Sequence, residues 1–175
     1  MGNPYHQTQG RLVNVYVPYT RLCPETKKAL DATKHSYTPI NVSKSDETYW
    51  ELLNSLWSKG ETFAIVEHDI VIHKTALQEL ADCPRPWCAF PVPYFSSNHV
   101  GLGCVKFGSD LIKRFPNALD EVALMFDSKH PPKHWCRLDA WLQTRVLPQA
   151  ERHVHQPPLG HVRSGSVIKP SHGCL

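Results

Sequence analysis

Three polar residues, Glu67, His68 and Asp69, directly follow the apolar run 63–66. If that run continued as one strand, the two carboxylates would point to the same face, because side chains alternate with a period of two. Three adjacent polar residues on a buried strand are costly without partners. We therefore expect the strand to end near Val66 and the triplet to lie at its C-terminal edge, where open α/β sheets bind ligands.

Two carboxylates in this arrangement suit a hard divalent cation. Mg²⁺ and Mn²⁺ prefer oxygen ligands and often bind the phosphates of a substrate at the same time. The same triplet is equally typical of a polar turn, in which Asp69 accepts hydrogen bonds from nearby backbone N–H groups. The local pattern leaves both interpretations open.

The elements that must position the triplet alternate between strands and helices. In chain order, the patterns predict strands over 11–18, 37–43, 63–66, 87–95 and 100–108, and helices over 23–33, 45–60, 74–83, 109–115, 117–126 and 136–147. Pro18 is expected to stop the first strand, while Ser45 caps the second helix and Gly60 ends it. The order predicts a three-layer α/β sheet flanked by helices, largely parallel in its first half and mixed in its second.

The length and composition indicate one compact globular domain. The chain has 175 residues, of which 41% are hydrophobic and 20% charged, and it is too short for two ordinary domains. We expect a loose arm over 1–10, the domain over 11–165 and a tail over 166–175. The net charge of +3 and the dispersed Lys and Arg residues argue against a dedicated nucleic-acid-binding protein.

Targeting and cysteine patterns add two expectations. No signal-peptide pattern opens the sequence, and no apolar run approaches the ~18 residues of a membrane span, so we expect a cytoplasmic protein with no membrane partner. The six cysteines include no Cys-x-x-Cys pair, which argues against a zinc knuckle. Reduced thiols that serve as small core residues are the expected alternative.

An acidic triplet ending in Asp after a buried strand, in the middle of a chain that opens with a strand–helix unit, resembles the GT-A-fold glycosyltransferases. The resemblance implies a GT-A-like (Rossmann-like) mixed sheet and a D-x-D-like motif, whose Mn²⁺ or Mg²⁺ bridges the diphosphate of a nucleotide sugar. Here the motif reads Glu67-His68-Asp69, with Glu where the family has its first Asp. Asp69 is then the principal metal ligand, while Glu67 binds the ion, the ribose or a water molecule.

The strings NVYVPYTRL, VEHDIVI and LGCVKF further resemble the small glycosyltransferases encoded by bacteriophages. In the GT-A family the loop after the first strand holds the nucleotide, and here that loop contains Tyr19, Thr20 and Arg21. By this resemblance Tyr19 stacks on a base and Arg21 meets a phosphate. The plain alternative is a half-buried aromatic residue followed by a solvated charge at a helix start.

Two later segments carry further implied roles. Gly101 and Gly103 resemble the family's glycine-bearing strand beside the donor sugar, where they let a ligand approach the backbone. Asp139 resembles the acidic residue near the acceptor, a general base that takes the proton of the acceptor hydroxyl. Their plain alternatives are a glycine pair at a strand bulge and a first-turn Asp favoured by the helix dipole.

The last element of the family is a late histidine that completes the metal shell. His155 and His161 are both candidates for this ligand. His161 is favoured, because Gly160 and Arg163 beside it suit a loop that closes over a pyrophosphate. The plain alternative is a solvent-exposed histidine in a proline- and glycine-rich tail.

The resemblance implies a metal-dependent, hexosyltransferase-like glycosyltransferase that moves a sugar from a nucleotide sugar, with a UDP-sugar favoured, to an acceptor hydroxyl. Some phage enzymes of this kind modify hydroxymethylated DNA bases, so DNA is a conceivable acceptor, and the compartment would then be the host cytoplasm. Two alternatives stay open. One is a nucleotidyl- or phosphoryl-transfer enzyme, which would need a further acidic residue facing Glu67 and Asp69. The other is a non-catalytic nucleotide-sugar-binding relic of the fold.

Overall fold

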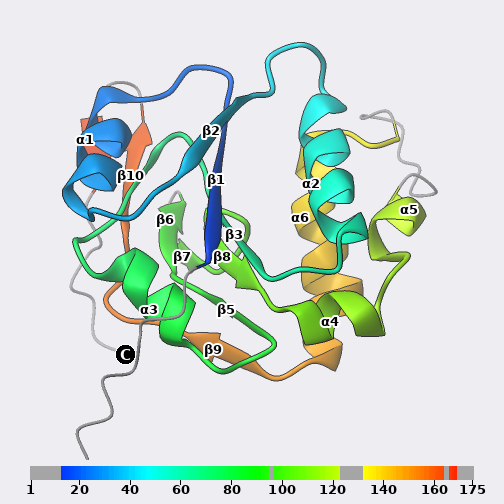
Figure 1. The fold of residues 1–175 in the computed structure, drawn as a ribbon. Coiled ribbons are helices and arrows are strands. Elements are labelled where there is room, and N and C mark those ends of the chain that lie inside the picture. The colour runs from blue at the N-terminus through cyan, green and yellow to red at the C-terminus, as the bar shows by residue number, and fades with distance from the viewer. Residues whose placement is uncertain (1–12, 95–96, 123–131, 164–165, 169–175) are drawn as a thin grey trace, which may run out of the picture.

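A mixed six-stranded sheet forms the centre of the fold (Figure 1). The computed structural model describes residues 13–94, 97–122, 132–163 and 166–168. In spatial order the strands are β2 (Thr38–Asn41), β1 (Asn14–Tyr19), β3 (Phe63–Val66), β8 (Cys104–Phe107), β5 (Trp87–Ala89) and β9 (Arg152–Val154). β1 is parallel to both of its neighbours, while β8 is antiparallel to β3 and β5. The predicted parallel first half and mixed second half are confirmed.

Helices cover both faces of the sheet and make three layers (Figure 1). One face carries α1 (Pro24–Ala32) and α3 (Ala76–Asp82); the other carries α2 (Thr48–Ser58), α4 (Ser109–Arg114), α5 (Ala118–Val122) and α6 (Trp135–Trp141), which continues through a π-helical turn (Leu142–Val146) and a 3-10 turn (Leu147–Gln149). β3 lies between the layers: Ala64 and Val66 pack toward α1 and α3, and Phe63 and Ile65 pack toward α2. Burial on both faces explains why the sequence of β3 is continuously apolar.

Three tryptophans hold the layer of four helices together. The indole N–H groups of Trp50, Trp57 and Trp141 donate to the carbonyl oxygens of Leu119, Phe115 and Ala118 over 2.8, 2.8 and 2.9 Å, respectively. A buried indole N–H needs a partner, so each bond fixes the direction of one ring as well as its depth. α2 and α6 are therefore both anchored to the segment around α5.

A three-stranded antiparallel sheet joins residues 160–168 to the chain that leaves the carboxyl end of β3. Its strands are β11 (Ser166–Ile168), β10 (Gly160–Arg163) and β4 (Ile70–Val71). β4 directly follows the polar triplet, and its register pairs Ile70 with His161. A separate hairpin is made by β6 (Val92–Tyr94) and β7 (Ser97–His99).

The first strand differs from its prediction at Pro18. β1 continues through this proline to Tyr19. Its pairing with β3 covers residues 14–16 only, so at Pro18 the strand pairs with β2 alone. A proline has no N–H to donate and is tolerated where one side of a strand has no partner. Val15 and Val17 are buried, while Asn14 is exposed and Tyr16 is partly buried, which is the alternation typical of a half-buried strand.

The second helix differs from its prediction at the start and agrees at the end. α2 begins at Thr48, and no side chain caps its first backbone N–H groups. Ser45 instead lies with its hydroxyl oxygen 3.1 Å from the hydroxyl of Thr48. Gly60 has a φ of +69° and donates its N–H to the carbonyl of Trp57, which confirms it as the residue that ends the helix.

Several short strands lie in segments predicted as irregular. β7 lies between the predicted strands 87–95 and 100–108, β9 and β10 follow the last predicted helix, and β11 lies in the predicted tail, so ordered strands extend past residue 165. Each has three or four residues, too few for alternation to be recognised. The predicted arm 1–10 and residues 123–131, which include the end of the predicted helix 117–126, lie outside the described residues. Within the described part of the chain, none of the helices has the length and apolarity needed to span a bilayer.

Candidate functional site

The triplet forms a turn at the C-terminal edge of β3. The strand ends at the fully buried Val66, as expected, and Ile70 N–H then donates to Glu67 O over 3.1 Å, which closes a four-residue turn. Glu67 N–H donates to Gly103 O over 2.9 Å, and Cys23 N–H, at the start of α1, donates to His68 O over 3.1 Å. The backbone of the turn is therefore fixed from both sides.

His161 lies against Asp69. Its Nε2 is 3.1 Å from Asp69 Oδ2, although the two residues are 92 positions apart in the chain. The pairing of β10 with β4 produces this contact, and Val162 N–H donates to Asp69 O over 2.7 Å. The structure thus brings together two of the three predicted metal ligands.

The contacts of Asp69 and His161 fit a divalent cation. Asp69 Oδ1 is buried and has no hydrogen-bond partner among the described residues. Both ring nitrogens of His161 face acceptors, because Nδ1 lies 3.2 Å from Pro93 O and Nε2 faces the carboxylate. A neutral imidazole has one N–H, so it can donate to only one of these two acceptors. A cation between Nε2 and the carboxylate would satisfy both groups on that side. Adjacent ligand atoms of an octahedral ion lie about 3 Å apart, given metal–ligand distances of about 2.1 Å, close to the observed 3.1 Å.

Glu67, the third predicted ligand, is oriented by a residue that the sequence did not single out. The hydroxyl of Tyr49 donates to Glu67 Oε1 over 3.1 Å, and Tyr49 itself is buried in α2. Tyr49 lies four positions before Leu53 on the apolar stripe of this helix, so its polar tip at the edge of the stripe was a signal that could have been recognised.

A cleft of about 360 Å³ opens over the triplet. The described residues that line it include Thr20 after β1, Asp46 and Tyr49 around the start of α2, the triplet itself, and Trp135 at the start of α6. Trp135 keeps 54% of its surface exposed, which is unusual for a ring of this size. Asp46 adds a third carboxylate to the lining, and its Oδ2 lies 3.7 Å from His134 Nε2. Neither Asp46 nor Trp135 was predicted as a site residue.

The remaining predicted residues lie at varied distances from this cleft. Tyr19, the half-buried last residue of β1, and the exposed Arg21 flank Thr20 but are not among the described lining residues. Gly103 touches the triplet through its carbonyl, and Gly101 is buried in the same turn before β8, not within a strand. Their roles toward a ligand stay predictions.

The predicted base and the predicted phosphate contact are on the two elements that border the triplet and the cleft. Asp139 lies in α6, one helical turn after Trp135, and is partly buried. Arg163 is exposed at the end of β10, two positions after His161. Both roles stay predictions.

His155, the other candidate histidine, belongs to a different cluster of side chains. Its ring stacks on Phe90 with the centroids 4.7 Å apart, and its Nδ1 lies 3.8 Å from Glu79 Oε2. Burial, together with the neighbouring His153, lowers the pKa of His155 to about 4, which keeps the imidazole neutral at pH 7.

Comparisons with known proteins identify the fold. No family model matches the chain, and no curated protein matches it. Among solved structures, it is similar to A197 from STIV, with a TM-score of 0.61 and 9% identity over 93% of this chain and 92% of that one. It is also similar to a glycosyltransferase involved in the glycosylation of the major capsid of PBCV-1, with a TM-score of 0.52 and 12% identity over 83% of each chain. The chain therefore has a GT-A-like α/β fold.

Proposed function

We propose that the protein is a metal-dependent glycosyltransferase that moves a sugar from a nucleotide-diphosphate sugar to an acceptor hydroxyl. The observation that carries the proposal is Asp69, which lies at the carboxyl edge of a GT-A-like sheet against His161, with its second carboxylate oxygen buried and unpartnered among the described residues. The cleft over it, about 360 Å³, has a volume typical of small-ligand sites.

The charges of the cleft support a bound cation. Three carboxylates, those of Asp46, Glu67 and Asp69, line a space that has to accept a diphosphate. Without a cation they would repel that ligand. Asp69, His161 and Glu67 would hold Mn²⁺ or Mg²⁺, which when bound neutralises the charge of the leaving diphosphate as a Lewis acid.

The protein's own groups would position the two substrates. The exposed ring of Trp135 offers a flat surface on which a base or a sugar can stack. Tyr19 and Thr20 would border the nucleotide, and the guanidinium groups of Arg21 and Arg163 would pair with phosphate oxygens. Gly101 and Gly103 would let the donor sugar approach the backbone.

Asp139 would act as the base, accepting the proton of the acceptor hydroxyl at a carboxylate oxygen as that hydroxyl attacks the anomeric carbon. With the donor and acceptor held in this way, positioning accounts for much of the rate. A UDP-sugar is the favoured donor.

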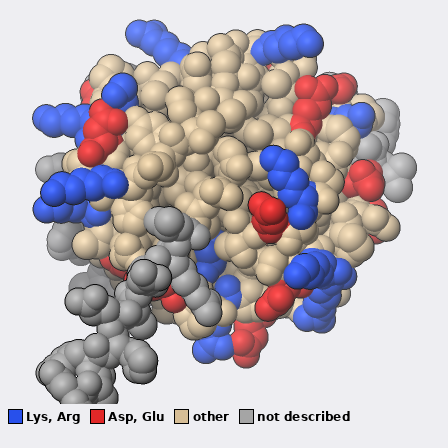
Figure 2. All heavy atoms as spheres, viewed as in Figure 1, with Lys and Arg blue, Asp and Glu red and all other residues tan. Residues whose placement is uncertain are grey.

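The acceptor is proposed from two sources. A hydroxymethylated DNA base of a phage genome is one acceptor in keeping with the bacteriophage resemblance. A protein is the other, because the similar PBCV-1 enzyme is involved in the glycosylation of a capsid. Figure 2 shows basic and acidic side chains interspersed on the viewed face, without one continuous basic area among the described residues of that face.

One observation favours a second candidate function. A nucleotidyl- or phosphoryl-transfer enzyme needs a further carboxylate near Glu67 and Asp69, and Asp46 lines the same cleft. The two functions differ in their products. Glycosyl transfer releases a nucleoside diphosphate, whereas nucleotidyl transfer releases pyrophosphate from a nucleoside triphosphate.

A thermal-shift screen tests the proposal. UDP and GDP are each added with and without Mn²⁺, and we expect a rise in melting temperature only when nucleotide and metal are both present. The rise should be lost in Asp69→Asn and retained in Asp82→Asn, which changes an exposed carboxylate at the end of α3. If no nucleotide raises the melting temperature, with or without Mn²⁺, the proposal is refuted. Release of UDP or GDP from a sugar donor, but not of pyrophosphate from a triphosphate, would then exclude both nucleotidyl transfer and a non-catalytic relic.

A further inference from the structure

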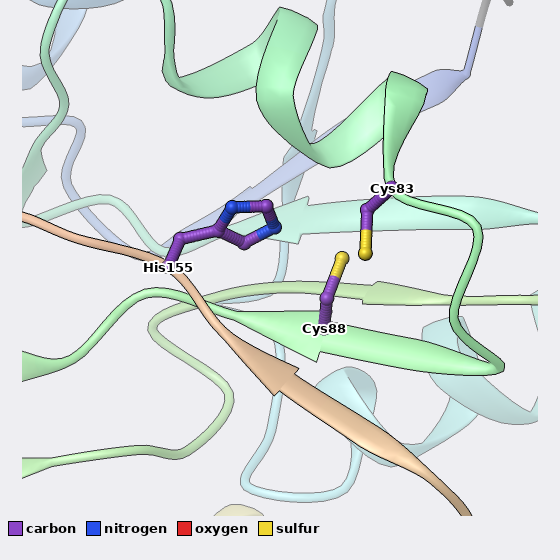
Figure 3. Close-up of side chains that lie close together, drawn as sticks. All are labelled: Cys83, Cys88 and His155. Carbon is purple, nitrogen blue, oxygen red and sulfur yellow. The ribbon is translucent and has the colours of Figure 1, made fainter.

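We propose that Cys83, Cys88 and His155 form a second metal site, which binds a soft divalent cation of the Zn²⁺ type. One ligand atom from each residue lies within 4.8 Å of the other two. Figure 3 shows the two sulfur atoms pointing toward each other and the imidazole ring of His155 pointing toward them. This site is separate from the cleft that Asp46, Glu67 and Asp69 line. The described lining residues of that cleft include none of its three ligands, and the site does not depend on the proposed glycosyl transfer.

Three different elements hold these ligands in place. Cys83 directly follows α3, with its N–H donating to Glu79 O, and Cys88 is the fully buried middle residue of β5. His155 follows β9, and its own N–H donates to Ala89 O over 2.9 Å, next to Cys88. The ligands are therefore fixed by the backbone before any ion arrives, which reduces the cost of binding.

The side chain of His155 is oriented as a metal ligand. It is 7% exposed, and its Nε2 is buried without a hydrogen-bond partner among the described residues. Its other nitrogen, Nδ1, faces the carboxylate of Glu79 at 3.8 Å, and Thr75 Oγ1 donates to the other oxygen of that carboxylate. At this distance the carboxylate attracts an N–H on Nδ1 electrostatically, which favours the tautomer that keeps the lone pair of Nε2 available for a metal.

The ligand chemistry selects the kind of ion. Two thiolates and one imidazole are typical of zinc sites and unfavourable for Mg²⁺ or Mn²⁺, which prefer oxygen. With Zn–S bonds of about 2.3 Å and Zn–N bonds of about 2.0 Å, the ligand atoms of a tetrahedral ion lie roughly 3.5 to 3.8 Å apart. The cluster, with its atoms within 4.8 Å, reaches that spacing by a small contraction. Three protein ligands leave the fourth position to water or a small anion.

The surrounding charges balance a bound ion. Lys106 is buried, and its ammonium donates to Cys83 O, while Glu79 carries the opposite charge on the far side of His155. The charges of Lys106 and Glu79 already cancel each other. Binding of Zn²⁺ with loss of the two thiol protons adds two positive and two negative charges, so the net charge around the site does not change. Burial raises the pKa of the Cys88 thiol, so the ion has to displace its proton, and affinity comes from the metal–sulfur bonds.

The site connects the main sheet to the segment that leads into β10. His155 is six positions before His161, and Leu159 N–H between them donates to Pro91 O over 2.9 Å. Because binding to the folded state alone stabilises it by mass action, zinc should stabilise this connection against unfolding.

The test uses the full chain, purified under reducing conditions and stripped of metal with a chelator. Adding Co²⁺, a spectroscopic substitute for Zn²⁺, should produce a thiolate-to-cobalt charge-transfer band at one ion per chain, and Zn²⁺ should abolish it. The band should be lost in Cys88→Ala and weakened in His155→Gln. Cys104→Ala, which changes a buried thiol in β8 outside the cluster, is the matched control and should keep the band.

Two results would overturn the proposal: no charge-transfer band in the fully reduced wild-type protein, or a band of full intensity in Cys88→Ala. If Cys88→Ala fails to fold, as judged by circular dichroism, Cys83→Ser at the less buried ligand takes its place with the same expectation. The Mn²⁺-dependent nucleotide shift of the first site is measured on the same variants and should be retained, so failure of one site is distinguishable from failure of the other.

Discussion

Removing one hydroxyl in α2 should lower both the stability of the protein and the affinity of the cleft over Glu67 and Asp69 for a metal ion, without changing any proposed metal ligand. Tyr49→Phe deletes the group that donates to Glu67 Oε1 over 3.1 Å and leaves the ring packed in the core. Hydrogen bonds to charged groups contribute about 1.5–3 kcal/mol, and the half-buried Glu67 puts this one near the lower limit. For a chain of 175 residues, a loss of about 1.5 kcal/mol lowers the melting temperature by roughly 3–6 °C.

The same substitution should lower the affinity for Mn²⁺. Groups that orient a metal ligand are worth about 10–100-fold in metal affinity, so a decrease of at least about tenfold is expected. Isothermal titration of Mn²⁺ in the presence of UDP measures it. Tyr37→Phe is the matched control, because Tyr37 also donates its hydroxyl to a carboxylate, that of the exposed Asp31, and water can replace that bond.

Two outcomes would contradict a role for Tyr49 at the metal site. If Tyr49→Phe binds Mn²⁺ as tightly as the wild type while its melting temperature falls, Tyr49 only supports folding and Glu67 is not oriented for a metal. If both quantities match those of the wild type and of Tyr37→Phe, the bond between Tyr49 and Glu67 does not contribute in solution.

The remaining predictions concern the ion, the base and the aromatic residues. His161→Ala should abolish the Mn²⁺-dependent nucleotide shift, measured by thermal melting, because it removes the contact on Asp69 Oδ2; a full shift would exclude His161 as a ligand. Asp139→Asn should reduce turnover by about 10²–10⁴-fold with nucleotide affinity unchanged, and full turnover would remove Asp139 from the role of base. Trp57→Ala should cost about 3–5 kcal/mol in chemical denaturation, since this ring is 2% exposed. Trp135→Ala, at 54% exposure, should leave stability nearly unchanged and weaken nucleotide binding in titration, and the reverse pattern would contradict the stacking role.

Local chemistry made parts of the fold predictable. The alternation of β1, the continuous apolar run of β3 and the glycine that ends α2 each depend on neighbours within one element, so the sequence was enough to identify them. The end of β3 at Val66 was likewise predictable, because three polar residues cannot continue a strand that is buried on both faces.

Contacts between residues that are far apart in the sequence limited how much of the candidate sites could be predicted. Asp46 and Trp135 line one cleft although they come from segments 89 positions apart (135 minus 46), and no periodic pattern connects them. The cysteines at 83 and 88 did not match a Cys-x-x-Cys pair, and His155, the third member of the cluster, comes 67 positions after Cys88 (155 minus 88), beyond α4, α5 and α6 in the chain. The predicted proximity of His161 to the triplet came from family resemblance, since three- and four-residue strands leave too little pattern to place a histidine.

The pairing of β10 with β4 has a consequence for the order of events during synthesis. Asp69 emerges from the ribosome long before His161, and within the described residues β4, two residues long, pairs with β10 alone. A nascent chain can therefore build β1, β2 and β3 while its acidic turn is still uncovered on the side that β10 will occupy. If metal binding needs both residues, as proposed, it cannot begin until residue 161 has left the ribosome, late in the protein's own translation.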